Sequence, residues 1–476
     1  MLFNSFIFLV FLLVVLPLFY YTKKEHRNLL VLISSYIFYG YWDWRFCFLL
    51  AISTVVDYFI GQRLHAADDE KTRKRFLLFS MCVNLGILAV FKYFNFFIDS
   101  FDAVAGMFGG NLDFLHLHII LPVGISFYTF QTMSYTIDIY RRRLEPTTNF
   151  IDFALFVSFF PQLVAGPIER ASNLLPQIAK GLNPTKEQMQ AGINLIIIGM
   201  FKKVMIGDAC GRIVDHVFAQ PEYYSSPELI MGLVLFSIQI YADFSGYSSI
   251  ARGTSKLLGI ELMKNFEQPY LSSNITEFWR RWHISLSSWL KDYLYISLGG
   301  NRKGKNRTYV NLMLTMLLGG LWHGASWNFV IWGGLHGIYL AVHKLTLGKN
   351  KPQVSYTYDN AKGFILYVSK VLATYLLVLF TWLFFRAHTF GDATAFLEGI
   401  FIWEGSPLAM RCFTISFGFM AMTILLDIIM YYTKDHTFMR RVQSVPARWG
   451  ILSGMMLITM IYMFVEEPLP FVYFQF

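Results

Sequence analysis

The chain has 476 residues, of which 55% are hydrophobic, 18% aromatic and only 15% charged. Because a soluble domain carries about 25% charged residues, this composition excludes an ordinary soluble globular protein. Apolar runs of about 20 residues recur along the chain, and each is long enough to cross a bilayer core of about 30 Å. The alternating segments typical of a membrane β-barrel are absent. We therefore predict an all-α polytopic membrane protein with a single domain over residues 1–476.

The formal net charge is +9, and the Lys and Arg residues lie mostly between the apolar runs. Positively charged loops of this kind are typical of the cytoplasmic side of a membrane protein, so we expect no nucleic-acid partner. The four cysteines form no CxxC pair, which predicts neither a disulfide framework nor a metal site. They are Cys47, Cys82, Cys210 and Cys412.

The first predicted span, about 2–21, lacks the basic start and the cleavage site of a signal peptide, so we expect it to remain uncleaved. Basic clusters follow alternate spans and favour the cytoplasm, which places the N-terminus outside. These clusters lie at 23–27, 63–75 and 141–143. The next predicted spans are about 28–41, 46–62, 76–98 and 119–139.

Two segments in the middle of the chain depart from simple spans. Residues 150–167 are apolar but have cationic flanks and contain Pro161 and Pro167. This pattern favours a re-entrant segment that is buried in protein. The sixth predicted span, about 190–208, contains Lys202 and Lys203. We expect these side chains to reach the membrane surface or to face a polar cavity.

The seventh predicted span, about 228–247, leads into a basic cytoplasmic section at 251–307. Within that section Asn274 and Glu277 resemble a helix capping box. The helix that they open carries aromatic side chains near one face, which predicts an amphipathic helix at the membrane interface. These side chains are Phe278, Trp282, Trp289 and Tyr293.

A hairpin of two predicted spans, about 308–321 and 326–343, follows the basic section. Three more spans complete the chain, so that we expect about 11–12 membrane helices in total and both termini outside. They are about 363–385, 412–432 and 449–466.

The hairpin holds the most unusual stretch of the sequence, LGGLWHGASWNFVIWGGLH, at residues 318–336. It contains no Asp, Glu, Lys or Arg, yet His323 lies in its first third. A titratable group at membrane depth is energetically unfavourable, which makes His323 a candidate functional residue. Its glycines allow close approach of backbone to backbone or to a ligand. A hydrogen-bonded histidine that joins two helices is the alternative.

A second histidine, His283, lies in the basic section, with Ser287 one helical turn later. A neutral imidazole can accept a proton from a hydroxyl near pH 7, and burial keeps the imidazole neutral. His336 lies on the second arm of the hairpin, where helix packing is a sufficient explanation.

Two further clusters have both a functional and a structural interpretation. Tyr241 and Asp243 lie near the end of the seventh span, and a buried Asp243 needs a cationic partner. Candidates for that partner are Arg252, Arg280 and Arg281.

The stretch GGNRKGK at 299–305 could cradle phosphates or form an ordinary basic loop, and it is not a P-loop. The sequence has no HExxH, GxSxG, Rossmann or Walker motif, and no Ser-His-Asp spacing supports a serine nucleophile.

Taken together, five stretches resemble the membrane-bound O-acyltransferase superfamily, and most closely its branch of bacterial alginate O-acetyltransferase membrane subunits. The resemblance covers nearly the whole chain in order. The stretches are LVAGPIER (163–170), YADFSGYSSIARG (241–253), NFEQPYLSSNITEFWRRWHISLSSWLKDYLYISLGGNRKG (265–304), LGGLWHGASWNFVIWGGLHG (318–337) and FVYFQF (471–476). A D-alanyl transfer branch shares the Trp-His-Gly pattern but is usually shorter.

The resemblance implies a ring of tilted helices around a funnel, with His323 at the position of the family's key histidine and His283 at its second polar position. It implies acetyl transfer across the inner, cytoplasmic membrane from a cytoplasmic thioester, with acetyl-CoA as co-substrate and no permanently bound cofactor. The acceptor would be an external polysaccharide or a partner protein that relays the acetyl group.

On this interpretation His323 acts as a general base and the neighbouring residues line a channel. The expected channel residues are Trp322, Gly324, Trp327, Asn328, Ser287, Tyr241 and Asp243. Exposed cations would attract the CoA phosphates. These are Arg280, Arg281, Arg302 and Lys303.

Two other functions suit the same features. A transporter or flippase for a lipid-linked glycan would also use buried histidines and broken helices, although the sequence shows no inverted repeat. A non-catalytic scaffold of a polysaccharide export complex is the third possibility. The sequence identifies neither the acceptor glycan nor the oligomeric state.

Overall fold

The computed structural model describes residues 1–110, 112–117, 119–164, 166–347, 360–402 and 409–474, and every regular element within these ranges is helical. The described residues cluster into two compact units. Unit 1 comprises residues 1–197 and 247–263, and unit 2 comprises residues 198–246 and 264–476. The expected all-α fold is confirmed, whereas the single-domain organisation stays a prediction.

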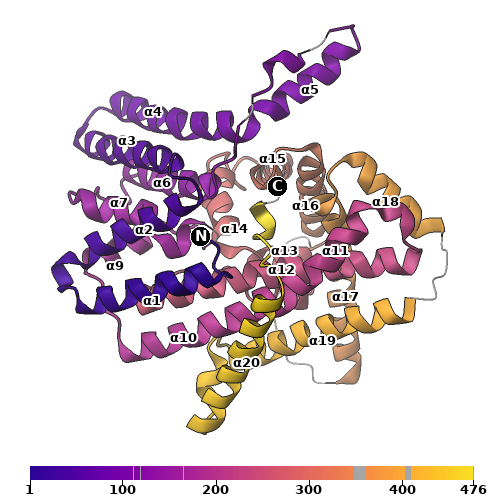
Figure 1. The fold of residues 1–476 in the computed structure, drawn as a ribbon. Helices are drawn as coiled ribbons and strands as arrows, with labels where there is room; N and C mark the ends of the chain where they lie inside the picture. Colours follow the sequence, from indigo (N-terminus) through magenta and orange to yellow (C-terminus); the bar gives the residue numbers. More distant parts are fainter. Residues whose placement is uncertain (111, 118, 165, 348–359, 403–408, 475–476) are drawn as a thin grey trace. The chain divides into compact units, whose positions relative to one another are not determined.

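Unit 1 contains the N-terminal helices (Figure 1). In it α3, α4 and α6 pack on one another, and α7 packs against α2, α3 and α9. The helices are α1 (Phe6–Tyr21), α2 (Arg27–Asp43), α3 (Phe46–Ala66), α4 (Glu70–Leu88), α5 (Phe94–Gly106), α6 (Ile125–Tyr140), α7 (Phe150–Ser158), α8 (Phe160–Leu163) and α9 (Ala171–Ala179).

The apolar stretch predicted to be re-entrant forms α7 and α8. The helix breaks at Phe159, and the side chains from Asp152 to Val164 are buried. Its burial agrees with the requirement that broken backbone at membrane depth be enclosed by protein.

The remaining helices lie wholly or partly in unit 2. They are α10 (Lys186–Phe201), α11 (Ala209–Ala219), α12 (Ser226–Leu257), α13 (Ile275–Arg281), α14 (Ile284–Trp289), α15 (Lys305–His323), α16 (Trp327–Leu347), α17 (Ala361–Arg386), α18 (Phe390–Ile402), α19 (Ala409–Thr433) and α20 (Val445–Val465). Two of the three unit boundaries fall within α10 and α12, and the third follows residue 263. Between α10 and α11 the helix continues as a π-helix, η4 (Lys202–Asp208).

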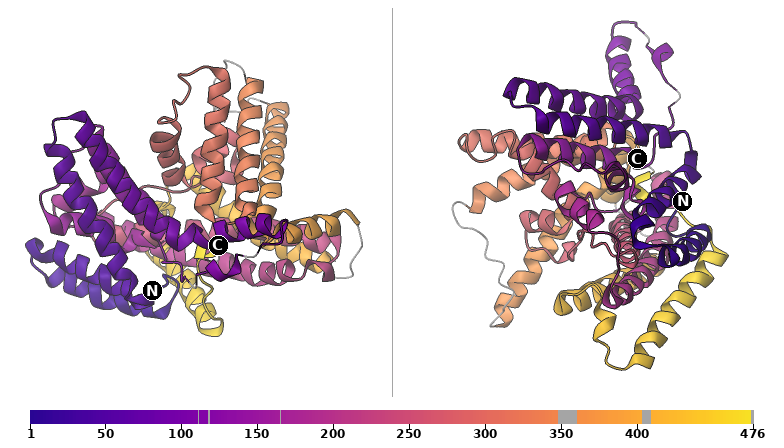
Figure 2. Two further views of the ribbon diagram at one scale, coloured as in Figure 1. Left: turned by 90° about the horizontal axis from the view of Figure 1, so that it is seen from above. Right: turned by 90° about the vertical axis from the view of Figure 1, so that its left-hand side faces the viewer.

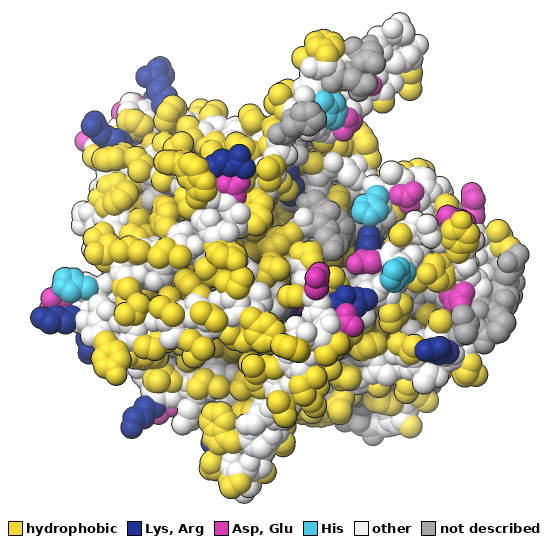
Figure 3. All heavy atoms as spheres, in the orientation of Figure 1, with side chains coloured by type: hydrophobic (Ala, Val, Ile, Leu, Met, Phe, Trp, Pro, Cys, Tyr) yellow, Lys and Arg dark blue, Asp and Glu magenta, His cyan; other side chains and the backbone are white. Residues whose placement is uncertain are grey.

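Six described helical stretches are long and apolar enough to cross a membrane, judged by length and composition. Large hydrophobic side chains cover much of the surface, and charged side chains are sparse on the face shown in Figure 3. Together these features define an integral membrane protein. The six stretches are Phe46–Ala66, Glu70–Gly106, Ser226–Leu257, Ala361–Arg386, Met410–Thr433 and Val445–Val465.

The predicted hairpin is present as α15 and α16, with α17 packed beside α16 (Figures 1 and 2). Its two arms approach closely because glycines of each arm lie against the backbone of the other arm. A Cβ on Gly320 would lie 2.1 Å from the carbonyl oxygen of Phe329, and a Cβ on Gly333 would lie 2.3 Å from that of Met316. Neither distance is possible for a real side chain, so the absence of a Cβ at these positions sets the spacing of the hairpin.

The prediction of one amphipathic interfacial helix after Asn274 is wrong in two respects. The side chain of Asn274 does cap α13, but the helix stops at Arg281 and restarts at Ile284. The aromatic face is buried in the protein, with Trp282 fully buried and Trp289 only 5% exposed. These side chains pack against other aromatic rings, so the periodic pattern reports a protein core.

Candidate functional site

His323 is the last residue of α15, and Gly324 follows it in an extended conformation. A Cβ at Gly324 would lie 2.1 Å from the ring of Phe329, so any larger residue would have to displace that ring. The His323 side chain is 4% exposed and is surrounded by aromatic rings. The ring centroids of Trp332, Trp322, Phe385 and Tyr473 lie 5.0, 5.1, 5.4 and 5.4 Å from that of His323.

His283 lies in the break between α13 and α14, with φ of +41°, a left-handed conformation unusual for a residue with a side chain. Its side chain is fully buried, and the Phe244 ring packs edge-on against it at 4.6 Å. Burial lowers the pKa of His283 to about 3, so that the ring is neutral near pH 7.

The structure brings the two histidines together although they are 40 positions apart in sequence. Their ring centroids are 6.5 Å apart, and the Trp322 ring contacts both. One histidine comes from the end of α15 and the other from the α13–α14 break. A pair of imidazoles in a water-poor aromatic environment suits proton transfer to and from a hydroxyl or thiol.

The other residues predicted for the channel have different positions. Trp322 is buried against the rings of His283 and His323, whereas Trp327 is 58% exposed at the start of α16. Asn328 is buried, and its amide donates to the carbonyl oxygen of Ala387, which ties α16 to the end of α17. The Ser287 hydroxyl donates to the carbonyl oxygen of Trp282 and stabilises the break beside His283.

Asp243 is buried, but its partner is none of the arginines suggested by the sequence. Its carboxylate lies 2.6 Å from the ammonium of Lys203, which also contacts Asp208 at 2.5 Å. Lys203 is fully buried, so it does not reach the membrane surface. The pairing was missed because Lys203 lies on another helix and is brought inward by η4.

Tyr241, two residues before Asp243 and on the other side of α12, takes part in a separate contact. Its hydroxyl donates to the Asp427 carboxylate at 2.7 Å, and its ring packs against Trp282 at 6.1 Å. It therefore supports the aromatic layer around the site.

The four cations suggested for phosphate binding divide into two kinds. Arg281 is buried and forms an ion pair with Glu277 at 2.7 Å, so it is committed to the structure of α13. Arg280, Arg302 and Lys303 are exposed. Only these three are accessible to a soluble phosphate group.

His336 has the structural role that the sequence allowed for it. Trp279 Nε1 donates to His336 Nδ1 at 3.3 Å, and Nε2 lies 3.0 Å from the hydroxyl of Thr381. That hydroxyl donates onward to the carbonyl oxygen of Val378. Both ring nitrogens are thus engaged in holding α13, α16 and α17 together.

A residue that the sequence reasoning missed is Tyr473. Its ring lies against those of His323 and Phe244, at 5.4 and 4.9 Å. The stretch FVYFQF, which resembles the family, could have drawn attention to Tyr473. No local pattern, however, links that stretch to a histidine 150 positions earlier. Gln475 and Phe476, the last two residues of the stretch, lie outside the described residues.

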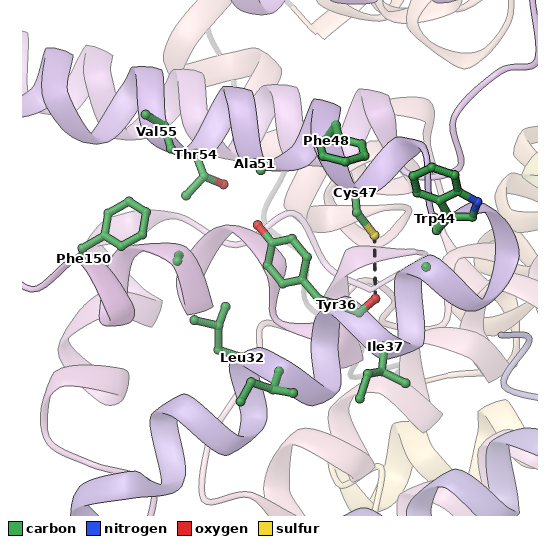
Figure 4. Close-up of a pocket in the computed structure, with 13 residues that line it drawn as sticks. Leu32, Tyr36, Ile37, Trp44, Cys47, Phe48, Ala51, Thr54, Val55 and Phe150 are labelled. Carbon is green, nitrogen blue, oxygen red and sulfur yellow. Dashed lines mark hydrogen bonds between the residues drawn. The ribbon is translucent and has the colours of Figure 1, made fainter.

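Unit 1 contains an apolar groove of about 800 Å³. Leu32, Tyr36, Cys47, Phe48 and Phe150 are among the residues that line it, and the Cys47 thiol contacts the carbonyl oxygen of Tyr36 (Figure 4). The groove contains none of the titratable pairs described above. It therefore has the character of a lipid-facing surface rather than of a reaction site.

The fold defines an integral membrane protein, and its buried pair of histidines has a geometry that suits proton transfer. The profile described as "MBOAT, membrane-bound O-acyltransferase family" matches residues 139–349. The chain is 44% identical over 413 residues to the probable alginate O-acetylase AlgI of Pseudomonas aeruginosa, covering 86% of this chain and 77% of that protein.

Two other relatives extend the comparison. The peptidoglycan O-acetyltransferase of Helicobacter pylori is 37% identical over 410 residues, covering 80% of this chain and 75% of the relative. The teichoic acid D-alanyltransferase of Streptococcus thermophilus is 29% identical over 247 residues, covering 48% and 58%. The chain belongs to the membrane-bound O-acyltransferase family, and it is an O-acyltransferase.

Proposed function

We propose that this protein transfers an acetyl group from a cytoplasmic thioester, acetyl-CoA, to hydroxyl groups of a polysaccharide outside the cytoplasmic membrane. The observation that carries the proposal is the burial of His323 beside His283 in a member of this family. The names of the relatives support the substrate class, since they include an alginate O-acetylase and a peptidoglycan O-acetyltransferase.

In the proposed reaction the acceptor oxygen attacks the thioester carbonyl carbon while His323 removes the hydroxyl proton. The carbon–sulfur bond then breaks, and the proton passes from His323 to the leaving thiolate. Negative charge on the carbonyl oxygen is stabilised by a neutral N–H donor, a role that we assign to His283. The aromatic rings around the pair exclude water and so protect the thioester from hydrolysis.

The donor and acceptor approach from opposite sides in this proposal. Exposed Arg280, Arg302 and Lys303 lie in the section with a cytoplasmic charge pattern and supply cations for the CoA phosphates. The same charge pattern supports a topology with both termini outside. The acceptor is either the polysaccharide itself or a partner protein that passes the acetyl group to it.

The test begins with purified protein and acetyl-CoA labelled in the acetyl group. Cleavage of the thioester that depends on an added acceptor supports the proposal, and a wild-type protein without any cleavage contradicts it. In cells, mass spectrometry of extracellular glycans with and without the gene identifies the acceptor.

The same cells separate the enzyme from the two other functions. A scaffold predicts that His323→Ala leaves glycan acetylation intact while loss of the whole protein abolishes it. A flippase predicts loss of external glycan rather than loss of its acetyl groups. Normal amounts of glycan without acetyl groups in the His323→Ala strain would fit only the proposed enzyme.

A further inference from the structure

The residues that follow α20 form a segment, 466–474, that ends in the 3-10 helix η9 (Val472–Phe474) and is attached to the rest of unit 2 at several points. The Arg212 guanidinium contacts the Glu466 carboxylate at 3.3 Å and donates to the carbonyl oxygen of Glu467. Lys203 Nζ lies 3.5 Å from the carbonyl oxygen of Pro470. The backbone N–H of Val472 donates to Asp243 Oδ2 at 2.6 Å.

The contacts of Pro470 and Val472 are made by members of one buried ion cluster. Lys203 is held between the carboxylates of Asp208 and Asp243, and all three side chains are at most 3% exposed. Asp243 uses one oxygen for Lys203 and the other for Val472. The charged cluster therefore ends on the backbone of the 466–474 segment, where a charge-assisted hydrogen bond is strong.

The next residue, Tyr473, is the one that reaches the histidines. Its ring packs against His323, Phe244 and Phe385, and Phe244 in turn packs against His283. The Tyr473 hydroxyl oxygen is buried, and within the described ranges it has no hydrogen-bond partner. A buried hydroxyl without a partner is unfavourable unless a substrate supplies that partner.

The Tyr473 phenol is protonated at neutral pH, as a hydrogen-bond donor must be. Burial, together with the nearby Asp243 carboxylate, raises the pKa of the Tyr473 phenol above its ordinary value. The phenol therefore keeps its proton at neutral pH and offers an O–H to an acceptor oxygen.

We propose that Asp243, paired with Lys203, is a positioning residue that holds the 466–474 segment at the histidine pair, where the Tyr473 hydroxyl donates a hydrogen bond to the acyl carbonyl oxygen. The donor role rests on the proposed function, whereas the positioning role does not. Tyr473 would act beside His283 on the negative charge that develops during the transfer.

The positioning role is tested by hydrogen–deuterium exchange on the full-length protein in detergent. Asp243→Ala removes the acceptor for Val472, so exchange in 466–474 should rise about tenfold or more. Asp243→Asn keeps an acceptor oxygen and should restore part of the protection. Asp57→Asn is the matched control, because this buried aspartate accepts from Ser80 and Asn84 within α3 and α4. Unchanged exchange in Asp243→Ala would overturn the positioning role.

The donor role is tested by Tyr473→Phe, which removes only the hydroxyl. We expect kcat for acetyl transfer to fall about 10²–10³-fold, the usual effect of losing one such donor, with KM and the melting temperature nearly unchanged. Tyr375→Phe is the matched control, since that hydroxyl already pairs with Ser237 at 2.8 Å. A Tyr473→Phe protein with the wild-type kcat would overturn the donor role.

The two tests fail separately. A wild-type protein without acetyl transfer would overturn the proposed function and with it the donor role. The exchange experiment would still decide whether Asp243 holds the segment, because it needs no substrate.

Discussion

His336 and His323 lie on the two arms of one hairpin, are both buried, and have similar aromatic neighbours, yet their surroundings differ in kind. His336 lies in a closed chain of hydrogen bonds from Trp279 through its ring to Thr381 and the backbone of Val378. His323 lies at the end of its helix among rings from four separate segments, next to a second histidine.

The difference shows why burial alone does not identify a functional histidine. A ring with both nitrogens engaged by protein groups can take part in proton transfer only by breaking those bonds. The packing of His323 is mostly aromatic, and it is shared with His283 and Tyr473, two groups that can exchange protons or donate hydrogen bonds. The following predictions separate these two kinds of site.

The largest effect is expected for His323→Ala. Loss of a general base should lower kcat for acetyl transfer by about 10²–10⁴-fold, with a folded protein by size-exclusion chromatography. A labelled acetyl-CoA assay measures the rate. Activity within threefold of wild type would remove His323 from the mechanism.

His336→Ala should reduce stability and leave the rate of acetyl transfer nearly unchanged. It leaves the Trp279 N–H and the Thr381 hydroxyl without their partner, which should reduce stability by about 1–3 kcal/mol. The protein that remains folded should keep a kcat within a few-fold of wild type. Thermal unfolding in detergent and the same transfer assay provide the two readouts. A stable His336→Ala protein with little activity would reverse the comparison.

Gly333→Ala tests the close packing of the two hairpin arms that carry His323 and His336. The new Cβ would meet the carbonyl oxygen of Met316, so the arms must separate, and overpacking of this kind costs about 1–3 kcal/mol. Gly454→Ala on α20 is the control, because no atom lies within 4 Å of its added Cβ. Equal melting temperatures for the two variants would argue against close packing of the arms.

The smallest effect concerns His283 and pH. Because burial lowers its pKa in the folded protein, the unfolded chain takes up a proton below about pH 6.5 that the folded chain does not. The free energy of unfolding should therefore fall as the pH is lowered from 7 to 5. His283 should account for about 2 kcal/mol of that loss at pH 5. His283→Gln should show a shallower loss of melting temperature over this range. An equally steep loss would mean that His283 is not buried as described.

Much of the fold could be predicted because its signals are local. The cap at Asn274, the glycines of the hairpin and the proline-containing stretch at 150–167 each act within a few residues. The break between α13 and α14 could not be predicted, because no glycine or proline marks it. The residue that adopts the left-handed conformation there is His283. Aromatic periodicity then predicted a membrane-facing helix where the rings pack into a protein core.

The candidate site was predictable in part for the same reason. His323 and His283 stood out as titratable residues within apolar or aromatic sequence. The partner of Asp243 and the position of Tyr473 depend on contacts between segments 40 and 150 or more residues apart, and one sequence contains no direct signal of such distances. Charge complementarity suggested an arginine, whereas the geometry of η4 provides Lys203.

That geometry makes the site depend on how this helix is wound as well as on its chemistry. Residues five apart point in different directions on an α-helix, but the wider turn of a π-helix brings Lys203 and Asp208 to one side. Winding these residues as an ordinary α-helix at the same spacing of five would leave the hydropathy of the helix unchanged and would rotate the two charges apart. A relative that is α-helical here at that spacing would keep both histidines and still lose the anchor for its 466–474 segment.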